Sequence, residues 1–133
     1  MDSTHKSIQH LQGAWLINKP AGITSFGVIE EIRRALIACS GLKKRDLPAL
    51  GHGGTLDPFA TGLLVLFVGR ATKLSQCYLG GTKTYCGRIR FGATTASGDI
   101  TDSIIQEPAT LPQDRAPVQA VANTFLGEPY AKV

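Results

Sequence analysis

The feature that most constrains the fold is residues 51–64, which read GHGGTLDPFATGLL. They join a glycine-rich loop to an apolar run, residues 63–68, that is short, contains β-branched residues and is bounded by glycines. Such a run predicts a buried strand. Just before it stands a single carboxylate, Asp57, followed at once by Pro58, which fixes φ and removes a backbone donor. The pattern predicts one acid at a stiff corner beside a core strand, although Asp-Pro also opens ordinary turns.

The remaining pattern predicts an α+β fold with a mostly antiparallel sheet and flanking helices. A hydroxyl side chain, Thr24 or Ser25, is expected to cap the first helix, and Gly41 is expected to end it. In a strand at 84–91, alternation predicts that Tyr85 and the apolar residues after it share a face that packs on a core. The elements expected are strands at 14–17, 63–68 and 84–91, helices at 24–39, 71–79 and 118–126, a basic linker at 42–50 and a long loop at 92–117.

Length and composition exclude several classes of protein. A chain of 133 residues suits one domain, and its formal charge of +4 is compatible with a polyanionic partner without requiring one. Three cysteines without Cys-x-x-Cys spacing and three scattered histidines predict reduced thiols and no metal site. Residues 1–12 form a polar tail without the apolar core of a secretory signal, and no apolar run approaches the ~20 residues that span a bilayer. The expected location is cytoplasmic, with no membrane partner.

Three further segments, together with this loop, form a pattern that is typical of a known protein family. They are NKPAGITS at 18–25, GRATKLSQ at 69–76 and KTY at 83–85. In this order and spacing, from about residue 15 to residue 99, the chain resembles the TruB family of pseudouridine synthases. The resemblance implies the pseudouridine synthase core fold and an enzyme of the stand-alone type, which isomerises uridine 55 in the T arm of tRNA. It implies no cofactor and leaves the oligomeric state open.

The resemblance also implies roles for individual residues. Asp57 matches the catalytic aspartate of the family. Three routes stay open for it: attack at C1′ of the ribose, attack at C6 of the uracil, or assistance to a route through a glycal intermediate. Tyr85 matches a tyrosine that stacks on the flipped uracil, and His52 matches a histidine near that nucleotide. Further expected substrate contacts are Gly53, Thr55, Arg70, Lys73 and Asp99, and expected supports of the catalytic loop are Lys19, Pro20, Gly51, Gly54, Leu56 and Pro58.

Most of these residues have a structural alternative. Tyr85 taken alone is a core tyrosine by periodicity, and His52 taken alone is a residue of a glycine loop. Arg70 and Lys73 equally suit helix capping or pairing with carboxylates. A nucleotide-phosphate loop is a poor alternative because residues 51–55 lack the Gly-Lys-Ser/Thr ending of a P-loop. Within the family, a guide-RNA-dependent rRNA enzyme is disfavoured because residues 60–64 and 92–99 resemble the stand-alone type.

The chain also departs from the family pattern. A Pro-Pro-x-Tyr-Ser-Ala-x-Lys segment is contracted here to residues 128–132, and the sequence given ends at Val133. In the family, a partner arginine for the aspartate and the apolar walls of the pocket lie further on. We therefore expect residues 13–133 to be the N-terminal part of a catalytic domain, either as a fragment or as a shortened product. The alternative function is a catalytically impaired RNA-binding remnant, and the chain alone is expected to bind RNA weakly.

Overall fold

The computed structural model describes residues 8–106 and 111–127, and the chain divides into two compact units, residues 1–84 and 85–133. The first unit contains a three-stranded antiparallel sheet of β1 (Gly13–Lys19), β2 (Leu50–His52) and β3 (Gly62–Val68), in the order β1-β3-β2. The apolar run is thus the central strand, and its buried residues include Leu66 and Phe67. The predicted buried strand and the antiparallel sheet are confirmed.

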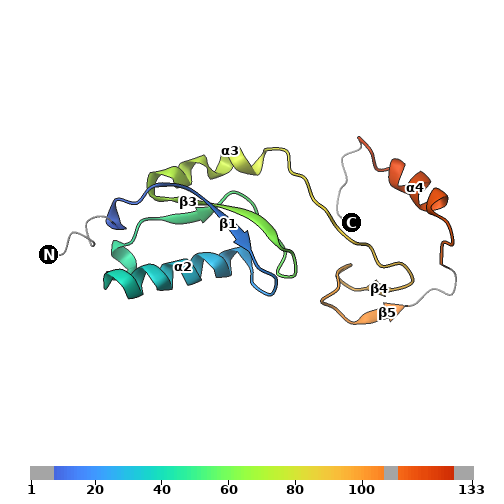
Figure 1. Ribbon diagram of the computed structural model, residues 1–133, viewed down its shortest axis with the longest axis horizontal. Helices are drawn as coiled ribbons and strands as arrows, with labels where there is room; N and C mark the ends of the chain where they lie inside the picture. The colour runs from blue at the N-terminus through green and yellow to red at the C-terminus, as the bar shows by residue number, and fades with distance from the viewer. Residues whose placement is uncertain (1–7, 107–110, 128–133) are drawn as a thin grey trace. The chain divides into compact units, whose positions relative to one another are not determined.

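One face of this sheet is covered by α2 (Ser25–Ser40), as Figure 1 shows. Val28 and Ile29 of the helix pack with Leu64 and Leu66 of β3 to form the core. The side chain of Thr24 accepts a hydrogen bond from the N–H of Gly27 at 2.8 Å and so caps the helix. The choice between the two hydroxyl residues therefore falls on Thr24, which leaves the hydroxyl of Ser25 free for another contact.

The helix ends as predicted at Gly41, which has a φ of 70° and donates its N–H to the carbonyl of Ile37. This left-handed conformation suits glycine because it has no Cβ. The basic linker that follows contains a single turn of 3₁₀ helix, η1 (Lys44–Asp46), before β2 begins at Leu50.

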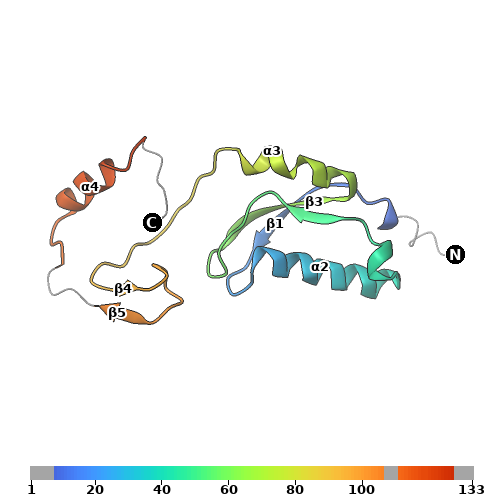
Figure 2. The same cartoon turned by 180° about the vertical axis from the view of Figure 1, so that it is seen from behind.

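The opposite face of the sheet carries the helical segment that follows β3. It starts as a 3₁₀ helix, η2 (Gly69–Leu74), and continues as α3 (Ser75–Leu79), so the predicted helix at 71–79 begins two residues early and in tighter form. Figures 1 and 2 both show α2 and α3 on opposite sides of the sheet. The ring of Tyr78 meets the ring of Phe67 edge-on, with centroids 5.2 Å apart, so this end of the face is covered.

The second unit differs most from the prediction. Within the stretch expected to be a loop, β4 (Thr94–Thr95) pairs antiparallel with β5 (Ile104–Gln106). The last helix, α4 (Arg115–Asn123), starts three residues earlier than predicted and ends earlier too, and Gly127 beyond it has a φ of 80°. Residues 128–132, where the contracted family segment falls, lie outside the described residues.

The predicted strand at 84–91 is wrong: these residues have no strand conformation in the structure. Tyr85 and Ile89, which were expected to pack on a core, are 70% and 81% exposed. A strand needs a hydrogen-bonding neighbour, and alternation alone does not supply one.

Two further findings concern the described residues as a whole. No helix among them is both long and apolar enough to cross a bilayer. The side chains of Cys39, Cys77 and Cys86 are free thiols, and all three are exposed.

Candidate active site

The loop that joins β2 to β3, residues 53–61, presents Asp57. It begins where the N–H of Gly53 donates to the carbonyl of Val65 at 2.9 Å, which extends the β2–β3 pairing by one step. A turn closes beyond the acid, because the N–H of Ala60 donates to the carbonyl of Asp57 at 3.1 Å. The carboxylate is exposed and has no ion-pair partner among residues 8–106 and 111–127.

The residue before Asp57 is held by a buried serine. Ser25, the first residue of α2, is 1% exposed. Its hydroxyl oxygen accepts a hydrogen bond from the N–H of Leu56 at 2.9 Å and donates to the carbonyl of Leu56 at 3.2 Å. The side chain of Leu56 packs against the core. One side chain, distant in sequence, thus fixes both backbone polar groups of the residue that precedes the acid.

The residue after Asp57 is held from the other side. The carbonyl of Pro58 accepts hydrogen bonds from the N–H of Gly22 at 2.8 Å and from Nζ of Lys19 at 3.2 Å. Lys19 is 0% exposed, and its Nζ also donates to the carbonyls of Pro20 at 2.8 Å and Ile23 at 2.6 Å. An ammonium group has three donors, and all three are used here. Residues 19–25 and 56–58 are therefore joined into one braced structure, with the carboxylate projecting from it.

The glycines of the loop are close to neighbouring elements. A Cβ added to Gly53 would lie 2.9 Å from Cε2 of Phe67 and 3.1 Å from Cβ of Tyr78, so only glycine fits without a shift. A Cβ on Gly54 would meet the side chain of Lys83 at 3.5 Å. Nζ of Lys83 donates to the carbonyls of Tyr78, Leu79 and Gly81, which closes the end of α3 beside the loop.

This packing predicts that Gly53→Ala destabilises the protein while Gly51→Ala does not. Overpacking against the ring of Phe67 should lower the free energy of unfolding by about 1–3 kcal/mol. A Cβ on Gly51 meets only Cγ2 of Thr72, at 3.7 Å, which is an ordinary contact. Chemical denaturation of the two variants, which have the same composition, measures the difference. Equal stability would show that the loop yields easily at Gly53.

His52 lies at the end of β2, opposite Leu66 in the antiparallel pair. Directly opposite residues share a face, so its side chain lies on the face that α2 covers. Its Nδ1 is buried and has no hydrogen-bond partner among the described residues. A buried nitrogen without a hydrogen-bond partner costs free energy.

The other expected contact residues lie elsewhere. Thr55 is exposed on the same loop as Asp57, whereas Arg70 and Lys73 lie in η2, beyond the opposite end of β3. Tyr85 and Asp99 belong to the second unit. The pKa of the Asp99 carboxyl is held below its ordinary value by hydrogen bonds from the side-chain hydroxyl and then the backbone N–H of Thr101.

Ser25 belongs to a segment, residues 18–25, that the resemblance links to bracing of the catalytic loop, but the sequence did not separate its role from that of Thr24. The sequence shows Thr24 and Ser25 as alternative caps, but nothing in it reports a contact that spans 31 positions. The sequence signal that could have identified this contact is the presence of two adjacent hydroxyl residues, Thr24 and Ser25. One hydroxyl suffices to cap the helix, so a second, adjacent hydroxyl that becomes buried needs its own partner.

Comparison of the sequence with known protein families identifies the family of this chain. The family model described as TruB family pseudouridylate synthase (N terminal domain) matches residues 42–133, which is more than half of the chain. The chain belongs to the TruB family. The matched residues include the Asp57 loop and β3.

Individual relatives extend the match toward the N-terminus. A protein named tRNA pseudouridine synthase B from Bordetella avium is 40% identical over 121 residues, which is 90% of this chain and 46% of the relative. Proteins of the same name from Geobacillus kaustophilus and Aquifex aeolicus are each 39% identical over 119 residues, 89% of this chain, and are covered to 39% and 38%. A match over 90% of the chain includes residues 19–25 as well as the loop. This TruB chain spans less than half the length of these curated relatives.

Proposed function

We propose that this chain carries the catalytic loop of an enzyme that converts uridine to pseudouridine in tRNA, with Asp57 as the catalytic carboxylate. The observation that carries the proposal is the brace: an exposed, unpaired acid whose two chain neighbours are both fixed by buried side chains. We further propose that both units are parts of one catalytic domain and that the enzyme works in the cytoplasm.

The reaction requires one carboxylate that is held in a fixed position. The bond between N1 of uracil and C1′ of ribose breaks, the base turns, and C5 bonds to C1′ while C5 loses its proton and N1 gains one. No atom is added, so the protein needs to hold the base and to trap or stabilise the electron-poor intermediate. A carboxylate does this by forming a covalent bond or by its charge. The gain from positioning is large only if the geometry is fixed, which the brace supports.

We propose supporting roles for the other expected site residues. Lys19, with Pro20 beside it, and the backbone of Leu56 and Pro58 would hold the acid, while Gly54 in the loop and Gly51 in β2 would leave space around it. His52, Gly53 and Thr55 would face the nucleotide, and Asp99 would orient RNA or a basic side chain. Arg70 and Lys73 would contact phosphates, the interaction that dominates affinity for nucleic acids.

Release of tritium from tRNA labelled at C5 of uridine tests the proposal, because isomerisation must expel the C5 proton. The protein that carries this chain should release tritium over many turnovers from whole tRNA and from a T-arm stem-loop. An unrelated stem-loop of equal length is the control. No release from either tRNA substrate would contradict the proposed reaction.

Substitution of Tyr85 should separate stacking from any role of its hydroxyl. The ring is exposed, so it is accessible to a flipped base. Base–aromatic stacking is worth about 1–3 kcal/mol, so Tyr85→Ala should weaken binding of the T-arm stem-loop by roughly 5-fold to 150-fold. Tyr85→Phe keeps the ring and should bind nearly as well as the natural protein. Equal binding by the two variants would assign Tyr85 no stacking role.

A further inference from the structure

Arg70 and Lys73 lie at the end of the first unit opposite to the Asp57 loop. β3 starts next to that loop at Gly62 and ends at Val68, two residues before Arg70. A strand of this length extends about 20 Å, at roughly 3.3 Å for each residue. Any ligand that contacts both cations and Asp57 must therefore be long.

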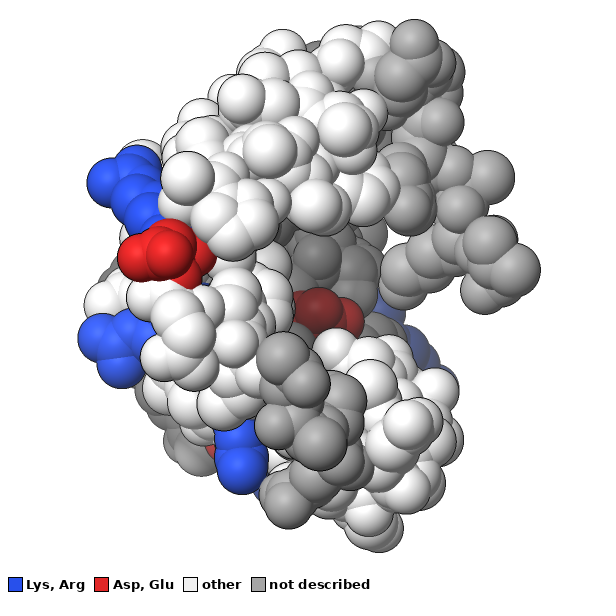
Figure 3. Space-filling model, turned by 90° about the vertical axis from the view of Figure 1, so that its right-hand side faces the viewer, with Lys and Arg blue, Asp and Glu red and all other residues white. Residues whose placement is uncertain are grey.

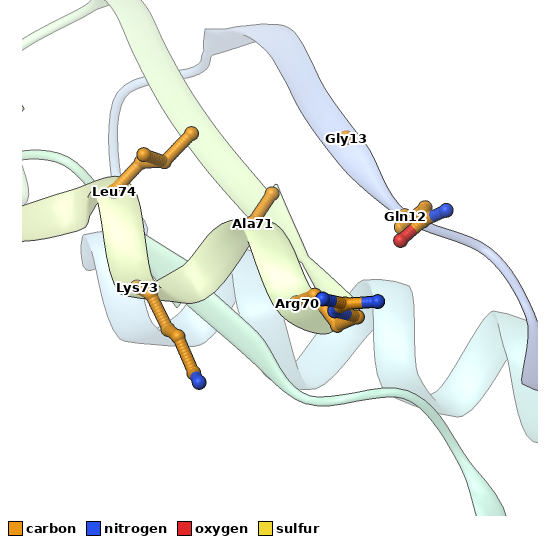
Figure 4. A pocket seen from close by; sticks show the side chains of 6 residues that line it. All are labelled: Gln12, Gly13, Arg70, Ala71, Lys73 and Leu74. Carbon is orange, nitrogen blue, oxygen red and sulfur yellow. The ribbon is translucent and has the colours of Figure 1, made fainter.

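Two adjoining depressions occur at this end, with volumes of about 450 and 370 Å³. Both are lined by Gln12 and Arg70, and together they form what we call the Arg70 groove. Lys73 belongs to the first depression, and Gln9 and His10 belong to the second. Figure 4 shows Arg70 beside Gln12, with Lys73 extending away from the N-terminal segment on the other side.

The N-terminal segment and η2 approach each other closely at Gly69. Gly69 has a φ of 62°, and a Cβ added there would lie only 2.6 Å from the carbonyl oxygen of Leu11. The N–H of Gly69 donates to the carbonyl of Ala49 at 2.8 Å, and the hydroxyl of Thr72 donates to the carbonyl of Gly69 at 2.8 Å. Glycine thus permits the close approach of the N-terminal segment to η2, and the groove is a built feature of the fold.

The groove offers hydrogen-bond donors without negative charge. Among the described residues, no Asp or Glu lines either depression, and neither Arg70 nor Lys73 has an ion-pair partner. Other cations of the unit do have partners: Arg33 and Lys44 both pair with Glu30. On the face shown in Figure 3, Lys and Arg side chains occur as separate patches, one of which adjoins an acidic side chain.

We propose that the Arg70 groove is a second RNA-binding site, which holds the sugar-phosphate backbone about 20 Å from the catalytic loop. The guanidinium of Arg70 and the ammonium of Lys73 bind phosphate oxygens, and the amides of Gln9 and Gln12 donate to neighbouring oxygens. This proposal rests on the proposed function, because it assumes that the long ligand reaching Asp57 is RNA. It adds where the RNA backbone beyond the reacting nucleotide is held.

The test compares two double variants of equal charge in the protein that carries this chain. Arg70→Gln with Lys73→Gln removes the groove cations, while Arg34→Gln with Lys43→Gln removes two exposed cations outside it that have no ion-pair partner among the described residues. Affinity for whole tRNA is measured between 50 and 200 mM salt. Two lost phosphate contacts should flatten the slope of log Kd against log salt by about 1.5. Between 50 and 200 mM salt, the Kd of the groove variant should therefore rise by a factor roughly eightfold smaller than the Kd of the natural protein.

Three outcomes are possible. A flatter slope for the groove variant alone supports the proposal, and equal slopes for the two double variants overturn it. Competition by inorganic phosphate, with tRNA binding unchanged in the groove variant, also overturns it, because the groove would then be a site for small anions. Failure of the proposed function is a separate result: the natural protein would release no tritium from tRNA, whatever its salt dependence.

Discussion

Replacing Asp57 by Asn should lower the rate of uridine isomerisation by at least about 10³-fold, since loss of a nucleophile typically costs that much or more. Asn has nearly the same shape, but its amide is a poor nucleophile and carries no charge. The loop should keep its conformation, because the brace acts on the backbone of the neighbouring residues. Binding of tRNA should therefore stay within a few-fold of the natural value.

The matched control is Asp46→Asn, which alters an exposed acid in η1 that pairs with Arg45 at 3.8 Å. Surface pairs of this kind contribute little to stability. This variant should isomerise uridine at the natural rate. If Asp57→Asn released tritium at an appreciable fraction of that rate, the catalytic role of Asp57 would be wrong.

The substitution Lys19→Met should cause the largest loss of stability. Methionine fills most of the buried space but leaves the carbonyls of Pro20 and Ile23 without the Nζ donor, while the carbonyl of Pro58 keeps the N–H of Gly22. Unsatisfied buried acceptors cost about 1–3 kcal/mol each, so a total near 3 kcal/mol is expected after partial relaxation. For a unit of this size the corresponding fall in Tm is roughly 10–20 °C.

Lys43→Met provides the comparison, because Lys43 is exposed and has no ion-pair partner among the described residues. Its effect on the free energy of unfolding should stay within about 0.5 kcal/mol. Below the Tm of Lys19→Met, turnover should fall more than tRNA binding, since the lysine holds the loop and touches no RNA. Unchanged turnover in that variant would show that the brace serves stability alone.

Local signals predicted β1, α2 and β3 of the first unit, but not the short strand β2, which falls on the expected linker and glycine-rich loop. An apolar run bounded by glycines became β3, and a hydroxyl followed by helical periodicity and Gly41 became α2. These elements obey rules that act over a few residues. The position of Asp57 at a stiff corner was predictable for the same reason, since Pro58 and the flanking glycines restrict the chain locally.

Long-range contacts were not predictable in this way. Ser25 meets Leu56 and Lys19 meets Pro58 only because the helix start and the loop come together in the folded unit. The strand predicted at 84–91 failed for a related reason, because alternation describes the faces of a strand and not the neighbour that it needs. The hairpin of β4 and β5 was missed because its strands are only two and three residues long.

We propose that Asp57, held in the braced loop, catalyses isomerisation of one uridine in the T arm of tRNA. The most direct measurement maps pseudouridine at nucleotide resolution in unmodified tRNA after incubation with the natural protein and with Asp57→Asn. We expect pseudouridine at position 55 alone with the natural protein and none with the variant. Modification at other positions only, or equal modification by the two proteins, would contradict it.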